Sequence, residues 1–109
     1  MSGLASRRKG VKGEREIAAL YEARGLDVRG LEASGDHLVV CDPESGLTLH
    51  SEVKRQERLR LPEWIAQAEA EAPAGTLAAV HFRQNRGRWY VVLRAEQFAD
   101  VLAARGLRP

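Results

Sequence analysis

The stretch LTLHSEVK, at Leu47–Lys54, alternates apolar and polar residues and follows the turn-forming pair Ser45-Gly46. Alternation with a period of two is typical of a β-strand that is buried on one side, so we predict a strand here. Its two faces carry different chemistry. The apolar face carries Leu47, Leu49 and Val53, and the polar face carries Thr48, His50, Glu52 and Lys54. A carboxylate and an ammonium group therefore project from the same face near the end of the strand.

An earlier aspartate adds a second carboxylate to this strand end. Asp36 opens an apolar run that ends at Cys41, and we predict that this run pairs beside Leu47–Lys54. Asp36 and Glu52 would then meet near Lys54. Carboxylate oxygens suit Mg²⁺, with Mn²⁺ as a substitute, whereas the sequence offers no set of thiolates for Zn²⁺. The alternative is a solvated strand face on which glutamate and lysine form ordinary ion pairs.

Such a site has the chemistry to act on a phosphodiester. With a cation held by Asp36 and Glu52, Lys54 would orient an attacking water or stabilise the negative charge that grows on phosphorus. Cleavage of DNA is therefore the leading hypothesis from these residues.

The predicted helix before these strands carries an acid on its apolar side. Glu14 stands three residues before Ile17 and seven before Tyr21, so it continues the apolar stripe and is expected to face the sheet. Glu16 lies at the edge of the stripe, and Arg15 points to the opposite side. The helix macrodipole offers another explanation for acids at a helix start, and it would suit Glu14 and Glu16 equally.

Short motifs extend this pattern over much of the chain: Arg8-Lys9-Gly10, Glu14-Arg15-Glu16, Leu26-Asp27-Val28-Arg29, Ser34-Gly35-Asp36 and Ser51-Glu52-Val53-Lys54. Together they resemble the Holliday junction resolvases of archaea and of some bacteriophages, within the PD-(D/E)XK nuclease superfamily. The similarity runs from about Arg8 into the second half of the sheet. The chain departs from the family's pattern at Gly35, where proline is frequent, and at His37, where an aliphatic residue is usual.

The resemblance implies which residues act. In that family the first helix supplies an acid and an arginine, and the sheet supplies an aspartate, a glutamate and a lysine. The implied catalytic residues are Glu14, Asp36, Glu52 and Lys54. The implied metal ligands are Asp36, Glu52, Glu14 and the backbone carbonyl of Val53. The residues expected to contact DNA are Arg7, Arg8, Lys9, Lys12, Arg15, Ser34, Arg55 and Arg58.

The predicted fold is α/β, with a restriction-endonuclease-like mixed β-sheet flanked by helices in the order αβββαββα. A basic arm is expected to about Lys12, followed by a helix to about Arg24. The expected strands are Leu26–Leu31, Asp36–Cys41, Leu47–Lys54, Thr76–Arg83 and Arg88–Arg94. The expected later helices are Pro62–Ala72 and Glu96–Arg105. Trp64 and Trp89 lie in apolar-periodic segments and are predicted to be core or interface residues.

Composition bounds the domain organisation and the location. The 109 residues are expected to form one domain, with the basic arm at about residues 1–12. No apolar run reaches membrane-spanning length and the N-terminus is basic, so we expect a cytoplasmic protein without membrane association, in the host cytoplasm if it is of phage origin. Cys41 is the single cysteine, and we expect it to be a buried, reduced thiol.

The predicted function is that of a metal-dependent, structure-selective endonuclease that resolves four-way DNA junctions by paired symmetric cleavage. Paired cuts need two equivalent sites and one domain carries one, so we expect a homodimer. An exposed apolar face in the second half of the chain, around Trp64 or the last hairpin, is the place to look for its interface. Two alternatives stay open. One is a nuclease of the same fold that acts on other DNA, such as a restriction-like or repair enzyme, and the other is a non-catalytic nucleic-acid-binding module.

Three polar residues near the site are weaker candidates. His50 shares the predicted face of Glu52, where it would contact a metal or a phosphate, although a histidine in a strand is more often a packing residue. His37, next to Asp36, is expected to point away from the site. Gln67, on the outer side of its helix, is a candidate DNA contact.

Overall fold

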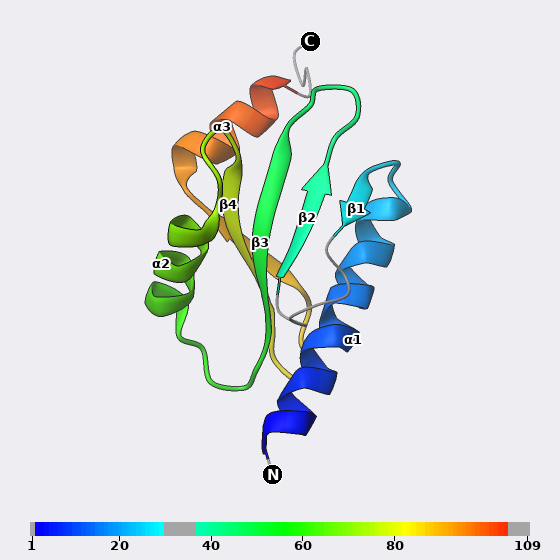
Figure 1. Cartoon of the computed structure of the whole chain (residues 1–109), viewed down its shortest axis with the longest axis vertical. Coiled ribbons are helices and arrows are strands. Elements are labelled where there is room, and N and C mark those ends of the chain that lie inside the picture. The colour runs from blue at the N-terminus through cyan, green and yellow to red at the C-terminus, as the bar shows by residue number, and fades with distance from the viewer. Residues whose placement is uncertain (1, 30–36, 105–109) are drawn as a thin grey trace.

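The secondary structure follows the predicted order. The computed structural model describes the backbone of residues 2–29 and 37–104, and the side chains of residues 12–29 and 37–104. The elements are α1 (Ser2–Glu22), β1 (Asp27–Arg29), β2 (His37–Cys41), β3 (Thr48–Arg55), α2 (Leu61–Glu71), β4 (Leu77–Arg83), β5 (Tyr90–Leu93) and α3 (Ala95–Ala104) (Figure 1). Apart from the start of α1, their ends lie within a few residues of the predicted ones.

Helix α1 begins at Ser2, well before its predicted start near Lys12. The basic segment that we expected to precede the helix therefore continues it. The run Arg7–Lys9 consists of good helix formers and no proline interrupts the segment, so Gly10 lowers the helix propensity without ending the helix. The other end is as predicted. Gly25 follows the helix with φ of 82°, in the left-handed region that favours glycine.

The strands form one mixed sheet in the order β1-β2-β3-β4-β5. Neighbouring strands are antiparallel except β3 and β4, which are parallel and are joined through α2. The register places His37 of β2 opposite Glu52 of β3, and Val80 of β4 on the other side of Glu52. Glu52 therefore lies on the central strand, between two neighbours.

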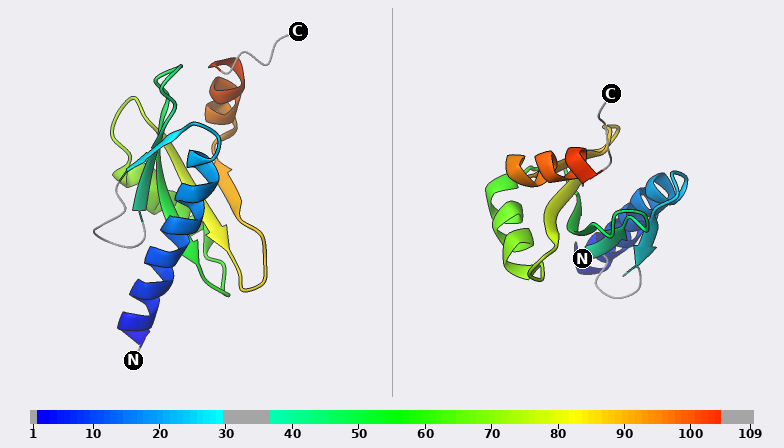
Figure 2. Two further views of the ribbon diagram at one scale, coloured as in Figure 1. Left: turned by 90° about the vertical axis from the view of Figure 1, so that its right-hand side faces the viewer. Right: turned by 90° about the horizontal axis from the view of Figure 1, so that it is seen from above.

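Helices α1 and α2 cover opposite faces of the sheet (Figure 2). The core under α1 contains Ile17, Leu38, Val40 and Val53. The core under α2 contains Trp64, Ala68, Ala78 and Val80. Because side chains alternate along a strand, Val53 faces α1 while Glu52 and Lys54 face the side of α2. The predicted polar face of β3 is thus the face that α2 covers.

Two tryptophans anchor these cores. Trp64 is 5 % exposed in the core under α2, so it is a core residue. Trp89 is half-buried against the α1 side, where a Cβ on Gly13 would lie 3.2 Å from its ring and 3.3 Å from Val53 Cγ1. Gly13 therefore permits α1 to approach the sheet closely.

Two further observations concern the cysteine and the helices. Cys41 is a free thiol, as predicted, but it is half-buried instead of buried. Within residues 2–29 and 37–104, no helix combines the length and apolar character needed to cross a bilayer.

Candidate active site

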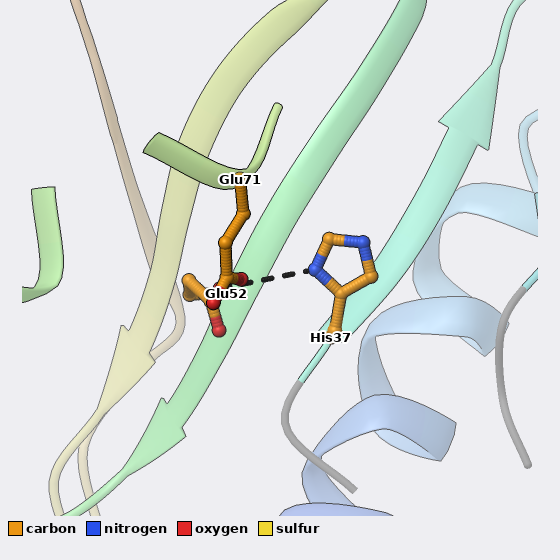
Figure 3. Close-up of side chains that lie close together, drawn as sticks. All are labelled: His37, Glu52 and Glu71. Carbon is orange, nitrogen blue, oxygen red and sulfur yellow. Dashed lines mark ion pairs between the residues drawn. The ribbon is translucent and has the colours of Figure 1, made fainter. Parts of the chain in front are cut away.

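Three side chains from three elements converge beside β3. They are His37 from the start of β2, Glu52 from β3 and Glu71 from the end of α2 (Figure 3). One nitrogen or oxygen atom of each lies within 4.8 Å of the others. Among the described residues, this is the group of histidine and acidic side chains with the spacing of a metal site.

Local structure explains this convergence. His37 is the cross-strand partner of Glu52, and directly opposed residues project from the same face of a sheet. Glu71 stands seven residues after Trp64 and three after Ala68, which are both buried against the sheet. Residues at these spacings share one face of a helix, so Glu71 reaches towards β3 as well.

The two carboxyl groups interact directly. Glu52 is 1 % exposed, whereas Glu71 lies at the exposed rim of the site. A hydrogen bond from the Glu52 carboxyl group holds the pKa of Glu71 below its usual range, and the nearby charge of Lys54 lowers that pKa further. Two carboxylates this close require a proton or a cation between them, since like charges disfavour joint ionisation.

The histidines form a second pair on the same face. Nδ1 of His37 lies 3.9 Å from Oε1 of Glu52, and Nε2 of His37 lies 3.2 Å from Nδ1 of His50. Burial, followed by the charge of His37, lowers the pKa of His50. A neutral His50 can accept a hydrogen bond from His37 and fix the orientation of its ring.

The donor set fits a divalent cation. Two carboxylates and an imidazole nitrogen supply ligands of the kind that divalent ions bind in proteins, and they leave positions for water or a phosphate oxygen. Lys54 is half-buried on the same face, so its ammonium group adds positive charge beside these ligands.

The other predicted residues fall into three groups. Val53 is buried and Arg55 is half-buried in β3. Lys12, Arg15 and Arg58 are exposed, as residues that contact DNA must be. Ser34 and Asp36 lie outside the described residues, as do the side chains of Arg7, Arg8 and Lys9. The roles assigned to all of these residues stay predictions.

The acids of α1 lie as the apolar stripe predicts. Glu14 is fully buried, whereas the side chain of Glu16 is 30 % exposed and lies 2.8 Å from Nη1 of Arg83. Arg15 is exposed. Glu14 is not one of the three clustered ligands, and α1 packs on the face of the sheet opposite to α2. Its part in metal binding therefore stays a prediction.

A second histidine site lies under α1. His81 of β4 is 3 % exposed, with Nδ1 2.6 Å from Oγ of Ser51 and Nε2 2.5 Å from the hydroxyl of Tyr21. Burial lowers the pKa of His81 to about 4 and raises the pKa of Tyr21. Tyr21 then donates to Nε2, and Nδ1–H donates to Ser51. Ser51 in turn donates to the backbone carbonyl of Glu52, at 3.0 Å. The apolar stripe of α1 thus ends at Tyr21 in a chain of hydrogen bonds through His81 to Ser51. This chain was not predicted from the sequence.

Sequence reasoning also missed two of the three clustered ligands. The expectation that His37 points away from the site is wrong, because the register places it opposite Glu52. Glu71 was not among the residues that the sequence singled out. It was detectable by the rule that singled out Glu14, since both acids extend a buried helical stripe.

Comparison with known proteins is consistent with this geometry. No curated protein and no solved structure matches the chain. Residues 5–107 match the model of a family described as "Phage putative PDDEXK endonuclease". The matched range includes all three clustered ligands and Lys54, and the mixed sheet flanked by helices is restriction-endonuclease-like. The chain therefore belongs to this phage family of PD-(D/E)XK endonucleases.

Proposed function

We propose that this protein is a metal-dependent DNA endonuclease that resolves four-way junctions, and that it makes the two symmetric cuts as a homodimer. One observation carries the nuclease part of this proposal. His37, Glu52 and Glu71 converge on the face of the sheet that also presents Lys54. A ligand set for a cation and a fixed positive charge thus lie together, as hydrolysis of a phosphodiester requires.

Each residue has a separate task. Glu52 and Glu71 would hold the cation through their carboxylates, and His37 through its imidazole, while Asp36 is the predicted further ligand. When bound, a divalent cation polarises the phosphoryl group and makes water more acidic. Lys54 would orient the attacking water and stabilise the charge that develops in the transition state.

Basic residues at one end of the molecule support a role in binding DNA. Figure 1 places the N-terminal half of α1 and the connection between β3 and α2 at the same end. Lys12 is exposed in α1 and Arg58 is exposed in that connection. Positive charge at this end would attract phosphates. Not every arginine is available for this, because Arg83 is paired with Glu16 and Arg94 lies 3.6 Å from Glu96.

The homodimer has a candidate surface on the second half of the chain. The side chains of Tyr90 and Val91 in β5 are 58 % and 44 % exposed, and Phe98 and Leu102 in α3 are 52 % and 40 % exposed. No residue of α3 is buried. Of the two predicted interface regions, Trp64 is in the core, so the hairpin strand β5 is the one that stays available.

Incubation with labelled DNA tests the proposal. A four-way junction, a duplex of equal length and a single strand are each incubated with the protein, with and without Mg²⁺ or Mn²⁺. We expect paired, symmetric cuts across the branch point that require the metal, and a particle of twice the chain mass in light scattering.

The alternatives give different results. A monomer that cuts duplex and junction equally well would contradict junction resolution and favour a nuclease of the same fold with another DNA substrate. Binding of DNA without cleavage under any metal would favour the non-catalytic module.

Salt dependence tests the basic end of α1 separately. Replacing Arg7, Arg8 and Lys9 by alanine should reduce the slope of log affinity against log salt by about three units if each contacts one phosphate. An unchanged slope would exclude these side chains from the DNA interface.

A further inference from the structure

We infer that the metal site takes a transition-metal ion, with Mn²⁺ as its probe, in preference to Mg²⁺, and that His37 sets this preference. The inference rests on the proposed function only in that a cation is held at Glu52. It concerns His37, which stands where the junction resolvases that the sequence resembles usually have an aliphatic residue.

The chemistry of the donors separates the two ions. Mg²⁺ strongly favours oxygen ligands and keeps much of its water. Imidazole nitrogen is a softer donor that first-row transition ions accept more readily than Mg²⁺ does. Mn²⁺ is the weakest binder of that series and, like Mg²⁺, also accepts carboxylates and water. A site made of Glu52 and Glu71 alone would serve both ions similarly. Adding the nitrogen of His37 stabilises bound Mn²⁺ more than bound Mg²⁺.

The separation of the ligand atoms is compatible with one shared ion. Nδ1 of His37 lies 3.9 Å from Oε1 of Glu52, which is too long for a hydrogen bond. Two atoms that each lie about 2.1 Å from the same cation are at most about 4.2 Å apart. The observed separation is within this limit, so rotations of the two side chains, without a change in register, can bring both atoms to one cation.

The environment of His37 prepares its ring for such a contact. Nδ1 is buried and makes no hydrogen bond within the part of the chain that the structure describes. The other ring nitrogen, Nε2, lies 3.2 Å from Nδ1 of His50. When Nε2–H donates to His50, the lone pair on Nδ1 faces Glu52. Histidines that bind metals commonly donate their second nitrogen to such a partner, which fixes the tautomer. His50 is thus a positioning residue.

Calorimetric titration of the purified protein tests the inference without any cleavage assay. MnCl₂ and MgCl₂ are titrated separately into the wild type and into His37→Gln and His37→Val. We expect the wild type to bind Mn²⁺ at least about tenfold more tightly than Mg²⁺. Both substitutions should lower Mn²⁺ affinity by about tenfold or more and leave Mg²⁺ affinity within about threefold, given the effects of removing ligands or their partners.

Two matched substitutions on α2 and one on β3 control for indirect effects. Glu71→Gln should weaken both ions, and Glu69→Gln, on an exposed position of the same helix, should weaken neither. His50→Gln should lower Mn²⁺ affinity by less than His37→Gln, since it removes only the orienting partner. Pulsed electron paramagnetic resonance of bound Mn²⁺ should detect coupling to a nitrogen in the wild type and lose it in His37→Gln.

Distinct outcomes overturn the inference and the proposed function. Equal affinities for the two ions, an unchanged Mn²⁺ affinity in His37→Gln, or no nitrogen coupling would overturn the metal preference while leaving a Mg²⁺-dependent nuclease intact. Failure to bind either ion would overturn the preference as well. The Mn²⁺ preference with no cleavage of any DNA would instead contradict the proposed function alone.

Discussion

The two faces of the sheet each contain a histidine close to β3, and the two rings are in opposite situations. Under α1, both nitrogens of His81 lie within 2.6 Å of a hydroxyl oxygen, and the side chain is buried. On the α2 side, His37 is 29 % exposed and directs Nδ1 towards Glu52 without reaching hydrogen-bond distance. The ring of His81 has no position left for a ligand, whereas the ring of His37 has one.

The difference separates a residue that holds the fold from one that is placed for chemistry. Ser51 and Glu52 are adjacent in the chain and face opposite sides, so one strand supplies both environments. The chain of hydrogen bonds from Tyr21 through His81 to Ser51 holds β3 in place on the α1 side of the sheet. The carboxyl group of Glu52 is then presented to the other face. Stability should depend on the first face, and metal binding and cleavage on the second.

The largest expected effect is on cleavage. Glu52→Gln and Lys54→Ala should each reduce the rate by about 10²- to 10³-fold, because they remove a ligand and an electrostatic group respectively. Asp36→Asn is predicted to behave like Glu52→Gln. The thermal unfolding midpoint should change little in Glu52→Gln, since the glutamine amide can still donate a hydrogen bond to the carboxylate of Glu71. Glu69→Gln is the control. Near wild-type cleavage by Glu52→Gln would mean that the α2 face is not the active site.

A second prediction compares the two acids of α1, the helix on the face of the sheet opposite to α2. Glu14→Gln should reduce cleavage by less than Glu52→Gln but clearly more than Glu16→Gln, because only Glu14 is buried. Glu16→Gln removes a partly exposed ion pair with Arg83, which contributes about 0.2–1 kcal/mol to stability. Rates and unfolding free energies of the two variants are measured side by side. Because α1 begins at Ser2, both acids lie within the helix and outside its first turn, so the macrodipole does not explain them. Equal, mild losses of activity would mean that the burial of Glu14 has no bearing on catalysis.

The pH dependence of stability should identify His81. An unfolded chain protonates this histidine near its ordinary pKa of 6.5, whereas the folded protein does so only near 4. The unfolded state therefore binds more protons between these values. The stabilisation is complete above pH 6.5 and is lost as the pH falls towards 4, by about 2 kcal/mol between pH 7 and pH 5.

Urea unfolding at several pH values measures how the free energy of unfolding depends on pH, and His81→Gln should weaken this dependence. The ring protons of His81, followed by nuclear magnetic resonance, give a second measurement on the wild type. A titration near pH 6.5 would contradict the description of His81 as a closed, neutral ring.

The order of elements was predictable from sequence because each element carries its own periodicity. The strand at β3 shows the period of two, and the stripe from Glu14 through Ile17 to Tyr21 shows the helical period. The start of α1 was not predictable in this way. The sequence of its first ten residues shows no apolar stripe that would separate a helix from an arm, so intrinsic propensity decides.

The site was predictable in part, for a related reason. Glu52 and Lys54 follow from alternation within one strand. His37 depends on the register between β2 and β3. The run Leu38–Cys41 is apolar on both faces, so its hydrophobic pattern does not select one register. Glu71 depends on the packing of α2 across the sheet, although its spacing from Trp64 and Ala68 carried the signal. Local sequence patterns therefore did not predict the contacts between elements that complete the site.

The smallest expected effect comes from removing one oxygen atom on the α1 side of the sheet. Tyr21→Phe keeps the ring, which packs edge-on against His81 with centroids 5.4 Å apart, and deletes the hydroxyl that donates to Nε2. A buried acceptor left without its donor costs about 1–3 kcal/mol of unfolding free energy, so we expect a loss in the lower half of this range.

The affinity for Mn²⁺ should stay unchanged, because the carboxyl group of Glu52 lies on the other face. If Tyr21→Phe weakened Mn²⁺ binding as strongly as it weakened the fold, the two faces of β3 would be coupled through Ser51, and the separation between a structural and a chemical histidine would be wrong.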